Sequence, residues 1–208
     1  MNFSAKKLLS YSASKLCWEL LNQDKVKPFQ MTPWIMEGQR YQQNVFSSLG
    51  KNYETEMCGC FVTEDGDNIY FSHDIVQKDG LKIIETKCNA DSKSSVIDLN
   101  YFNKSCLQCA LYDALTRFSS PHLNKSKFAI NEGDKNAYIK LQKEYEYFLS
   151  IDGAWFKIQL IDPYPIIKFV TDKINAVKKG YESCRAFDSI WKGNEVSRLS
   201  HCFKIIQI

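Results

Sequence analysis

Two acidic residues and a lysine stand in a pattern that could bind a divalent cation. Asp74 lies in one run rich in Val, Ile and Phe, and Glu85 and Lys87 lie in the next, with Asp79-Gly80 between the runs. If this dipeptide forms a two-residue hairpin turn, Asp74 lies directly across from Glu85. Side chains alternate along a strand, so Lys87 is expected on the same face as Glu85.

Two carboxylates opposed on one sheet face destabilise the sheet unless something neutralises them. Hard oxygen ligands at this spacing suit Mg²⁺ or Mn²⁺, which would remove the conflict. The alternative is a solvated sheet face, on which Asp and Glu on adjacent strands are common. Spacing alone leaves both interpretations open.

Further motifs lie on either side of this hairpin in a fixed order. Glu37-Gly38-Gln-Arg-Tyr-Gln42 precedes it, Gln108-Cys-Ala-Leu-Tyr112 follows it, and Ala186-Phe187-Asp188 lies late in the chain. Together with Asp74 and Glu85-Thr86-Lys87, this order resembles the PD-(D/E)XK nuclease superfamily, in its RecB-like branch. The resemblance extends over about residues 12 to 200.

The resemblance implies a role for each residue of the core motif. Asp74, Glu85 and the backbone carbonyl of Thr86 would hold one or two Mg²⁺ or Mn²⁺ ions, and Lys87 would orient or deprotonate the attacking water or stabilise the phosphorane. Gln42 stands where relatives carry a His or Glu ligand, so it could coordinate only through its amide oxygen. Asp74 also follows a histidine rather than the family's proline.

The helix motif and the overall activity follow from the same resemblance. Gln108 and Tyr112 lie one turn apart and would support the metal site or contact the DNA backbone. The implied function is hydrolysis of DNA phosphodiester bonds, as an exonuclease acting on single strands or duplex ends. Phage or mobile-element replication, recombination or end processing would be its setting. No feature indicates an oligomer, although rings occur among such exonucleases.

The elements needed to position these residues can be predicted from hydrophobic periodicity and turn signals. We expect helices near residues 12–21, 34–49, 103–118, 163–180 and 181–191. Strands are expected at 57–63, 68–77, 81–88, 145–151 and 154–161. The predicted fold is α/β: a central mixed sheet with an antiparallel core meander, flanked by helices and restriction-endonuclease-like. One domain is expected over residues 1–208.

Composition and charge exclude several classes of protein. The chain has 208 residues, 44% hydrophobic and 25% charged, which is typical of a folded globular protein. A net charge of +3 permits an anionic partner without requiring one. No apolar run is long enough to span a membrane, and Met1 to Leu9 lacks the apolar core of a secretory signal. We therefore expect the chain in the cytoplasm, of a bacterial cell or a phage-infected host.

The cysteines offer a competing interpretation as a zinc site. Cys58-Gly-Cys60 and Cys106-Leu-Gln-Cys109 have ligand-like spacings. The first pair is expected on one strand and the second inside a helix, so buried packing is favoured. The late chain offers Cys184 and Cys202 without the close pairs of an iron–sulfur cluster, and we predict none.

Three functions from different classes therefore remain. The first is the metal-dependent nuclease. The second is a catalytically weak or inactive module of the same fold, binding DNA or a protein partner, with Gln42 marking a weakened metal site. The third is a cysteine-based zinc protein. Dependence of activity on Mg²⁺ or Mn²⁺ separates the first from the second, and metal analysis tests the third.

Overall fold

The computed structural model describes residues 1–28, 30–88, 98–118, 122–124, 138–180, 182, 185–186 and 198–208. The helices of the described chain are α1 (Ala5–Ser10), α2 (Ala13–Leu21), α3 (Pro33–Leu49), α4 (Leu99–Phe118) and α5 (Tyr164–Lys179), with short 3-10 turns at Gln23–Lys25 and Ser200–Cys202. Most of the helix expected at 181–191 lies outside the described residues, as does the motif residue pair 187–188.

In the described parts of the chain, nine strands form one mixed sheet, in the order β6-β5-β2-β3-β4-β7-β8-β9, with β1 paired to β3 beside this path. The pairs β1–β3 and β4–β7 are parallel and the others are antiparallel. The predicted mixed α/β sheet with an antiparallel meander is confirmed. The strands are β1 (Asn2–Ser4), β2 (Tyr53–Val62), β3 (Asn68–Gln77), β4 (Lys82–Lys87), β5 (His122–Asn124), β6 (Tyr138–Lys140), β7 (Glu146–Ile151), β8 (Ala154–Leu160) and β9 (Phe203–Gln207).

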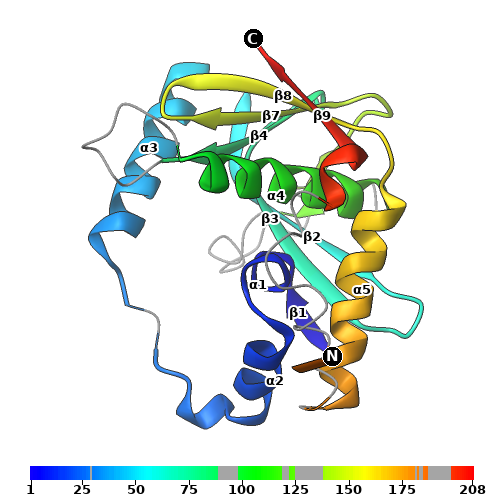
Figure 1. The fold of residues 1–208 in the computed structure, drawn as a ribbon. Helices are drawn as coiled ribbons and strands as arrows, with labels where there is room; N and C mark the ends of the chain where they lie inside the picture. The colour runs from blue at the N-terminus through cyan, green and yellow to red at the C-terminus, as the bar shows by residue number, and fades with distance from the viewer. Residues whose placement is uncertain are drawn as a thin grey trace.

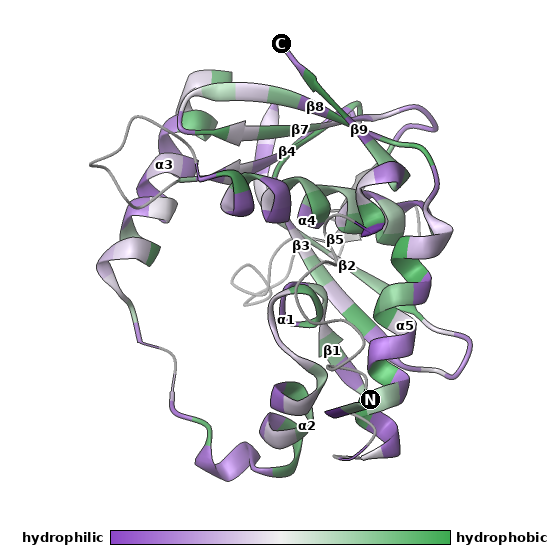
Figure 2. Cartoon of the chain, viewed as in Figure 1, coloured by the Kyte–Doolittle hydropathy of each residue, from purple (hydrophilic) through white to green (hydrophobic). Residues whose placement is uncertain are grey.

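Helices cover both faces of the sheet (Figure 1). On one face, α1, α4 and α5 enclose the larger core, whose fully buried side chains include Leu8, Leu111 and Phe169. On the other face, α3 packs over β4 and β2, where Val45 meets Ile75 and Ile84. Figure 2 shows the hydrophobic stretches of β3 and α5 on the packed side and hydrophilic stretches on α2 and the connection to α3.

Polar caps and glycines fix the helix ends near the predicted positions. The Ser12 hydroxyl accepts a hydrogen bond from the Lys15 amide at the start of α2, and Pro33 occupies the first turn of α3. Gly50 and Gly180, with φ of 82° and 100°, end α3 and α5. These boundaries follow from local chemistry and are confirmed.

Two hairpins set the strand registers. Asp152 and Gly153 form the predicted two-residue turn between β7 and β8, with φ of 47° and 86°. The turn predicted at Asp79-Gly80 was wrong in detail. The Gly80 amide donates to the Gln77 carbonyl at 2.8 Å, so the loop is longer by one residue on each side. Because this loop is symmetric, the register is unchanged.

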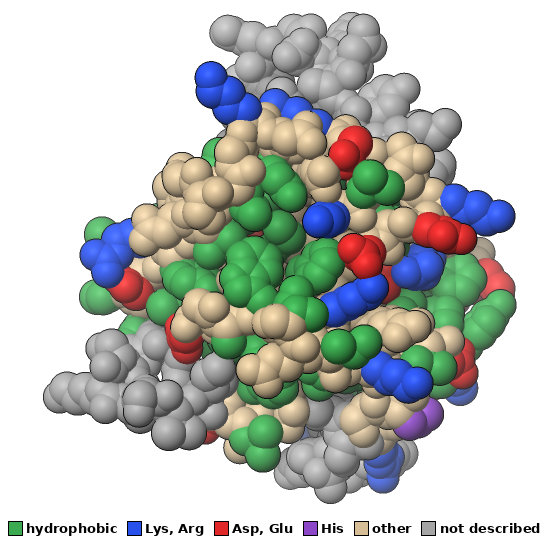
Figure 3. Space-filling view, turned by 90° about the horizontal axis from the view of Figure 1, so that it is seen from above, with side chains coloured by type: hydrophobic (Ala, Val, Ile, Leu, Met, Phe, Trp, Pro, Cys, Tyr) green, Lys and Arg blue, Asp and Glu red, His purple; other side chains and the backbone are tan. Residues whose placement is uncertain are grey.

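The two ends of the described chain add strands that the sequence analysis did not expect. At one end, β1 pairs with β3 and leads directly into α1. At the other, β9 is the last of the described strands in the sheet order; Ile205 and Ile206 in it, and Ile208 directly after it, are exposed. The face seen in Figure 3 carries a central group of hydrophobic side chains with charged side chains around it.

None of the helices in the described residues is both long and apolar enough to cross a membrane.

Candidate metal and substrate site

The site is built where one edge of β3 changes partner. The first residues of this edge, Asn68–Tyr70, pair with β1, and Ile75 and Val76 pair with Ile84 and Ile83 of β4. The two ladders leave residues 71–74 of β3 between them, so the sheet forks at this point. These β3–β4 pairs are those expected from the sequence, and Asp74 and Glu85 lie one residue beyond the last of them.

Side chains replace the missing ladder hydrogen bonds at the fork. The Asp74 carboxylate accepts from the Thr86 amide at 2.7 Å and from the Thr86 hydroxyl at 2.8 Å. The Gln42 amide nitrogen of α3 donates to the Asp74 carbonyl at 3.2 Å. On the opposite edge, Glu56 of β2 has a positive φ of 54°. Asp74 therefore points across the fork toward β4, held from both sides.

Glu85 and Lys87 form an ion pair beneath this fork. The Lys87 ammonium lies 2.6 Å from Glu85 Oε1, and the Gln108 amide of α4 donates to the same oxygen at 2.7 Å. Glu85 is only 1% exposed, and among the described residues its second oxygen, Oε2, is buried without a hydrogen-bond partner. A buried carboxylate oxygen without a donor is costly, which makes it an open position for a cation.

The charges of this group act on one another strongly. Burial and the nearby Asp74 carboxylate raise the pKa of Glu85 to about 7, although Lys87 acts in the opposite direction. Burial lowers the pKa of Lys87, but the Glu85 and Asp74 carboxylates outweigh it and hold that pKa above its ordinary value. The Glu85 carboxylate of this pair is therefore easily protonated, whereas the Lys87 ammonium does not easily lose its proton.

The donor set fits a hard divalent cation. The structure brings the Asp74 and Glu85 carboxylates to the same fork, and Gln42, whose amide nitrogen donates to the Asp74 carbonyl, lines the pocket there. Within the described ranges, no group of three or more His, Cys, Asp and Glu side chains is placed to share a metal ion. A cation here would therefore need amide, carbonyl or water oxygens besides two carboxylates.

The predicted helix motif divides into one residue at the site and one in the core. Gln108 donates to Glu85 and so orients it. Tyr112 is 4% exposed and its ring lies 6.0 Å from that of Phe71, in the larger core. A contact between Tyr112 and the DNA backbone is therefore incorrect, because α4 is buried on nearly all sides here.

His73, next to Asp74, is fully buried between two hydroxyl groups. Its ring nitrogens lie 2.9 Å from the Tyr147 hydroxyl and 3.0 Å from that of Thr116. Burial lowers the pKa of His73 to about 3, so the ring stays neutral well below its ordinary range. The neutral imidazole, with one donor and one acceptor, links β3 to β7 and α4.

We expect His73 to make the fold sensitive to acid. Its folded-state pKa is lowered, so its contribution to stability is complete above pH 6.5 and is lost as the pH falls toward 3. Relative to His73→Gln, the wild type should lose about 1.4 kcal/mol per pH unit below 6.5. Urea unfolding of both proteins at several pH values measures this difference, and a constant difference would contradict it.

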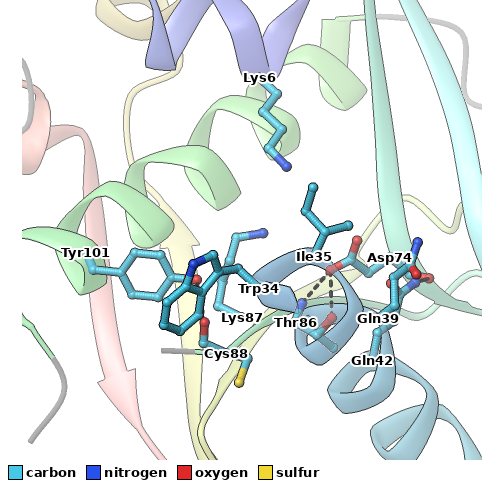
Figure 4. Close-up of a pocket in the computed structure, with 11 residues that line it drawn as sticks. Lys6, Trp34, Ile35, Gln39, Gln42, Asp74, Thr86, Lys87, Cys88 and Tyr101 are labelled. Atoms are coloured by element: carbon cyan, nitrogen blue, oxygen red, sulfur yellow. Dashed lines mark hydrogen bonds between the residues drawn. The ribbon is translucent and has the colours of Figure 1, made fainter. Parts of the chain in front are cut away.

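A pocket of about 560 Å³ opens above the fork. Asp74, Thr86, Lys87 and Gln42 line it, as Figure 4 shows, whereas Glu85 lies behind its wall. The lining residues that the sequence analysis missed include Lys6, Trp34 and Tyr101. Helical spacing gives no signal for them, because they meet only through the pairing of distant strands.

The cysteines do not form a metal site in the described chain. Cys106 and Cys109 are fully buried in α4, and burial raises the pKa of both thiols. The seven cysteines outside position 184 are not disulfide-bonded. Buried packing, as favoured from the sequence for both pairs, is confirmed for Cys106 and Cys109, whereas Cys58 and Cys60 are only half-buried. Cys184 lies outside the described residues.

Comparison with known proteins supports the fold alone. No protein-family model matches the sequence, and no curated protein matches it. Solved structures with a similar fold include the crystal structure of SSO0001, which is 14% identical, with a TM-score of 0.54. The similarity covers 84% of this chain and 75% of that one. At this identity the likeness is evidence for a shared architecture and not for a shared activity.

Proposed function

We propose that this protein is a metal-dependent nuclease that hydrolyses DNA phosphodiester bonds. The observation that carries the proposal is the buried Glu85, which is paired with Lys87, interacts with the Asp74 carboxylate and lies behind the wall of a pocket that Asp74 and Lys87 line. Packing does not require two acids and an amine at this place. Such a group suits a reaction that needs a cation, a proton acceptor and a positive charge near one phosphate.

Asp74, Glu85 and the Thr86 carbonyl would hold Mg²⁺ or Mn²⁺. Once bound, the ion would lower the pKa of a water and neutralise charge on the reacting phosphate. Thr86 fixes the direction of the Asp74 carboxylate through two hydrogen bonds, and Gln108 fixes that of Glu85. Lys87 lines the pocket and would orient the attacking water or bind a nonbridging phosphate oxygen.

The proposed biological role follows the family resemblance rather than the fold. It comprises exonuclease action on DNA ends in the cytoplasm, in phage or mobile-element replication, recombination or end processing. The modest positive charge of the chain is compatible with a DNA partner.

Digestion of end-labelled linear, circular and single-stranded DNA tests the proposal. With Mg²⁺ or Mn²⁺ we expect linear substrates to be degraded and circular ones to survive, and chelator should abolish cleavage. Degradation of circular DNA would show that the protein is an endonuclease and not an exonuclease. Intact substrates under every metal condition would contradict hydrolysis itself.

One observation favours the second candidate, a non-catalytic module that binds DNA or a protein partner. Gln42 donates its amide to a backbone carbonyl and supplies no charged ligand, so the two carboxylates would have to hold the cation with neutral oxygens. A binding module would retain its affinity for DNA or its partner after loss of Glu85 and Lys87, and would leave DNA intact.

A further inference from the structure

Lys6 enters the pocket from α1, far from the predicted motif in sequence. The parallel pairing of β1 with β3 places α1 beside the fork, and Figure 4 shows the Lys6 side chain extending from α1 into the pocket. Its ammonium has no carboxylate within ion-pair distance in the described ranges, whereas the neighbouring Lys7 pairs with Glu19 at 3.1 Å. Lys6 therefore presents a positive charge that is available to a ligand.

Two aromatic rings lie along another wall of the same pocket. Trp34, in the first turn of α3, is 58% exposed although it lines the pocket, and Tyr101 of α4 lies on the same side (Figure 4). The Tyr101 hydroxyl donates to the Cys88 carbonyl at 3.0 Å, which fixes its ring. An exposed indole at the mouth of a polar pocket offers a flat apolar surface to a planar group.

The pocket combines this surface with charges suited to a phosphate. Its volume, about 560 Å³, lies within the range of small-molecule sites and is enough for a nucleotide. A base inside a duplex cannot lie on Trp34, because it is already stacked on both sides, whereas any base of a single strand is free to do so. Flipping a paired base out of the duplex would cost the free energy of unstacking and unpairing it.

We propose that Trp34 and Lys6 form a subsite for one unpaired nucleotide of a single DNA strand, with the base on the indole and the phosphate on the ammonium. The proposal rests on the proposed function, because the strand would place its next phosphate at Asp74 and Lys87. It names the substrate class, single-stranded DNA, and two specificity-determining residues outside the predicted motif.

Equilibrium binding of a fluorescent oligo(dT) of about 12 nucleotides tests the proposal, with a duplex of the same length for comparison. Anisotropy is measured in CaCl₂, and gel electrophoresis of the recovered oligonucleotide checks that it is intact. We expect Trp34→Ala and Lys6→Ala each to weaken single-strand binding about 10-fold, and Trp34→Phe to retain most of it. Lys6→Ala should also lower the slope of log affinity against log salt by about 0.7.

Matched variants separate this subsite from general surface effects. Trp18 is exposed on α2 and Lys7 lies next to Lys6, and neither lines the pocket. Trp18→Ala and Lys7→Ala should change affinity less than about twofold. Equal losses in both pairs of variants, or duplex binding as tight as single-strand binding, would overturn the subsite.

The same measurements distinguish this inference from the proposed hydrolysis. Binding that depends on Trp34 and Lys6, without cleavage in Mn²⁺, would leave the subsite standing and contradict the nuclease. Cleavage in Mn²⁺ with unchanged binding in both variants would contradict the subsite and leave the nuclease standing. Absence of both binding and cleavage would overturn both.

Discussion

The double variant Glu85→Gln/Lys87→Met is expected to fold normally and to lose nearly all DNA cleavage. Both replacements keep the size of the side chain but remove its charge, so the cation loses a ligand and the phosphate loses its nearest ammonium. We expect cleavage in Mn²⁺ to fall at least about 1,000-fold, as measured with end-labelled linear DNA.

Although the double variant should lose activity, its free energy of unfolding should rise. At about pH 8 without metal, the ionised Glu85 destabilises the fold, because its pKa is raised to about 7. Replacing a buried ion pair by uncharged groups of similar volume is often neutral or stabilising, here by up to about 3 kcal/mol in the free energy of unfolding.

Urea unfolding with chelator present measures the difference in free energy of unfolding between the double variant and the wild type. The single variant Glu85→Gln serves as the control. That single variant leaves Lys87 without its carboxylate and should be less stable than the double variant. If the double variant instead unfolded several kcal/mol more easily than the wild type, the pair would be a structural ion pair.

Gly59→Ala is expected to destabilise the sheet severely. Gly59 of β2 pairs with Phe71 of β3, and an added Cβ would overlap the Cζ atom of that ring. The ring cannot move freely, because it is buried and lies 5.4 Å from His73 and 6.0 Å from Tyr112. We expect the free energy of unfolding in urea to fall by about 3 kcal/mol.

Gly38→Ala is the matched control. Gly38 lies in α3, and an added Cβ there would have no neighbour within 4 Å in the part of the chain that the structure describes. This replacement should stabilise the helix by about 0.5–1 kcal/mol. In a double-mutant cycle, Phe71→Leu should cost less in the Gly59→Ala background than in the wild type, by about 1 kcal/mol or more. Additive effects of the two changes would contradict the clash.

Local signals in the sequence were sufficient for much of the fold. The limits of β3, the caps of α2 and α3 and the turn at Asp152 depend on residues within a few positions of one another. The β3–β4 register was also correct although the turn was not, because adding one residue on each side of a turn keeps the same pairs opposite.

Long-range pairing accounts for what could not be predicted. The three residues of β1 are too few to show a period, and they pair with residues 66 positions away. Lys6 and its place in the pocket depend on that pairing. Tyr112 was misplaced for another reason: α4 buries polar side chains such as Asp113 and Thr116 through hydrogen bonds, so a polar pattern there does not mark an exposed face.

The fork in β3 affects how related proteins could diverge in the nucleic acid that they accept. Residues 71–74 are released from cross-strand pairing on one edge, while β2 still holds β3 on the other. The chemistry would remain with Asp74 and β4, whereas α1, α3 and α4 supply the surrounding wall. Changes on those helices could therefore alter which nucleic acid is accepted without altering the sheet that carries the reacting groups.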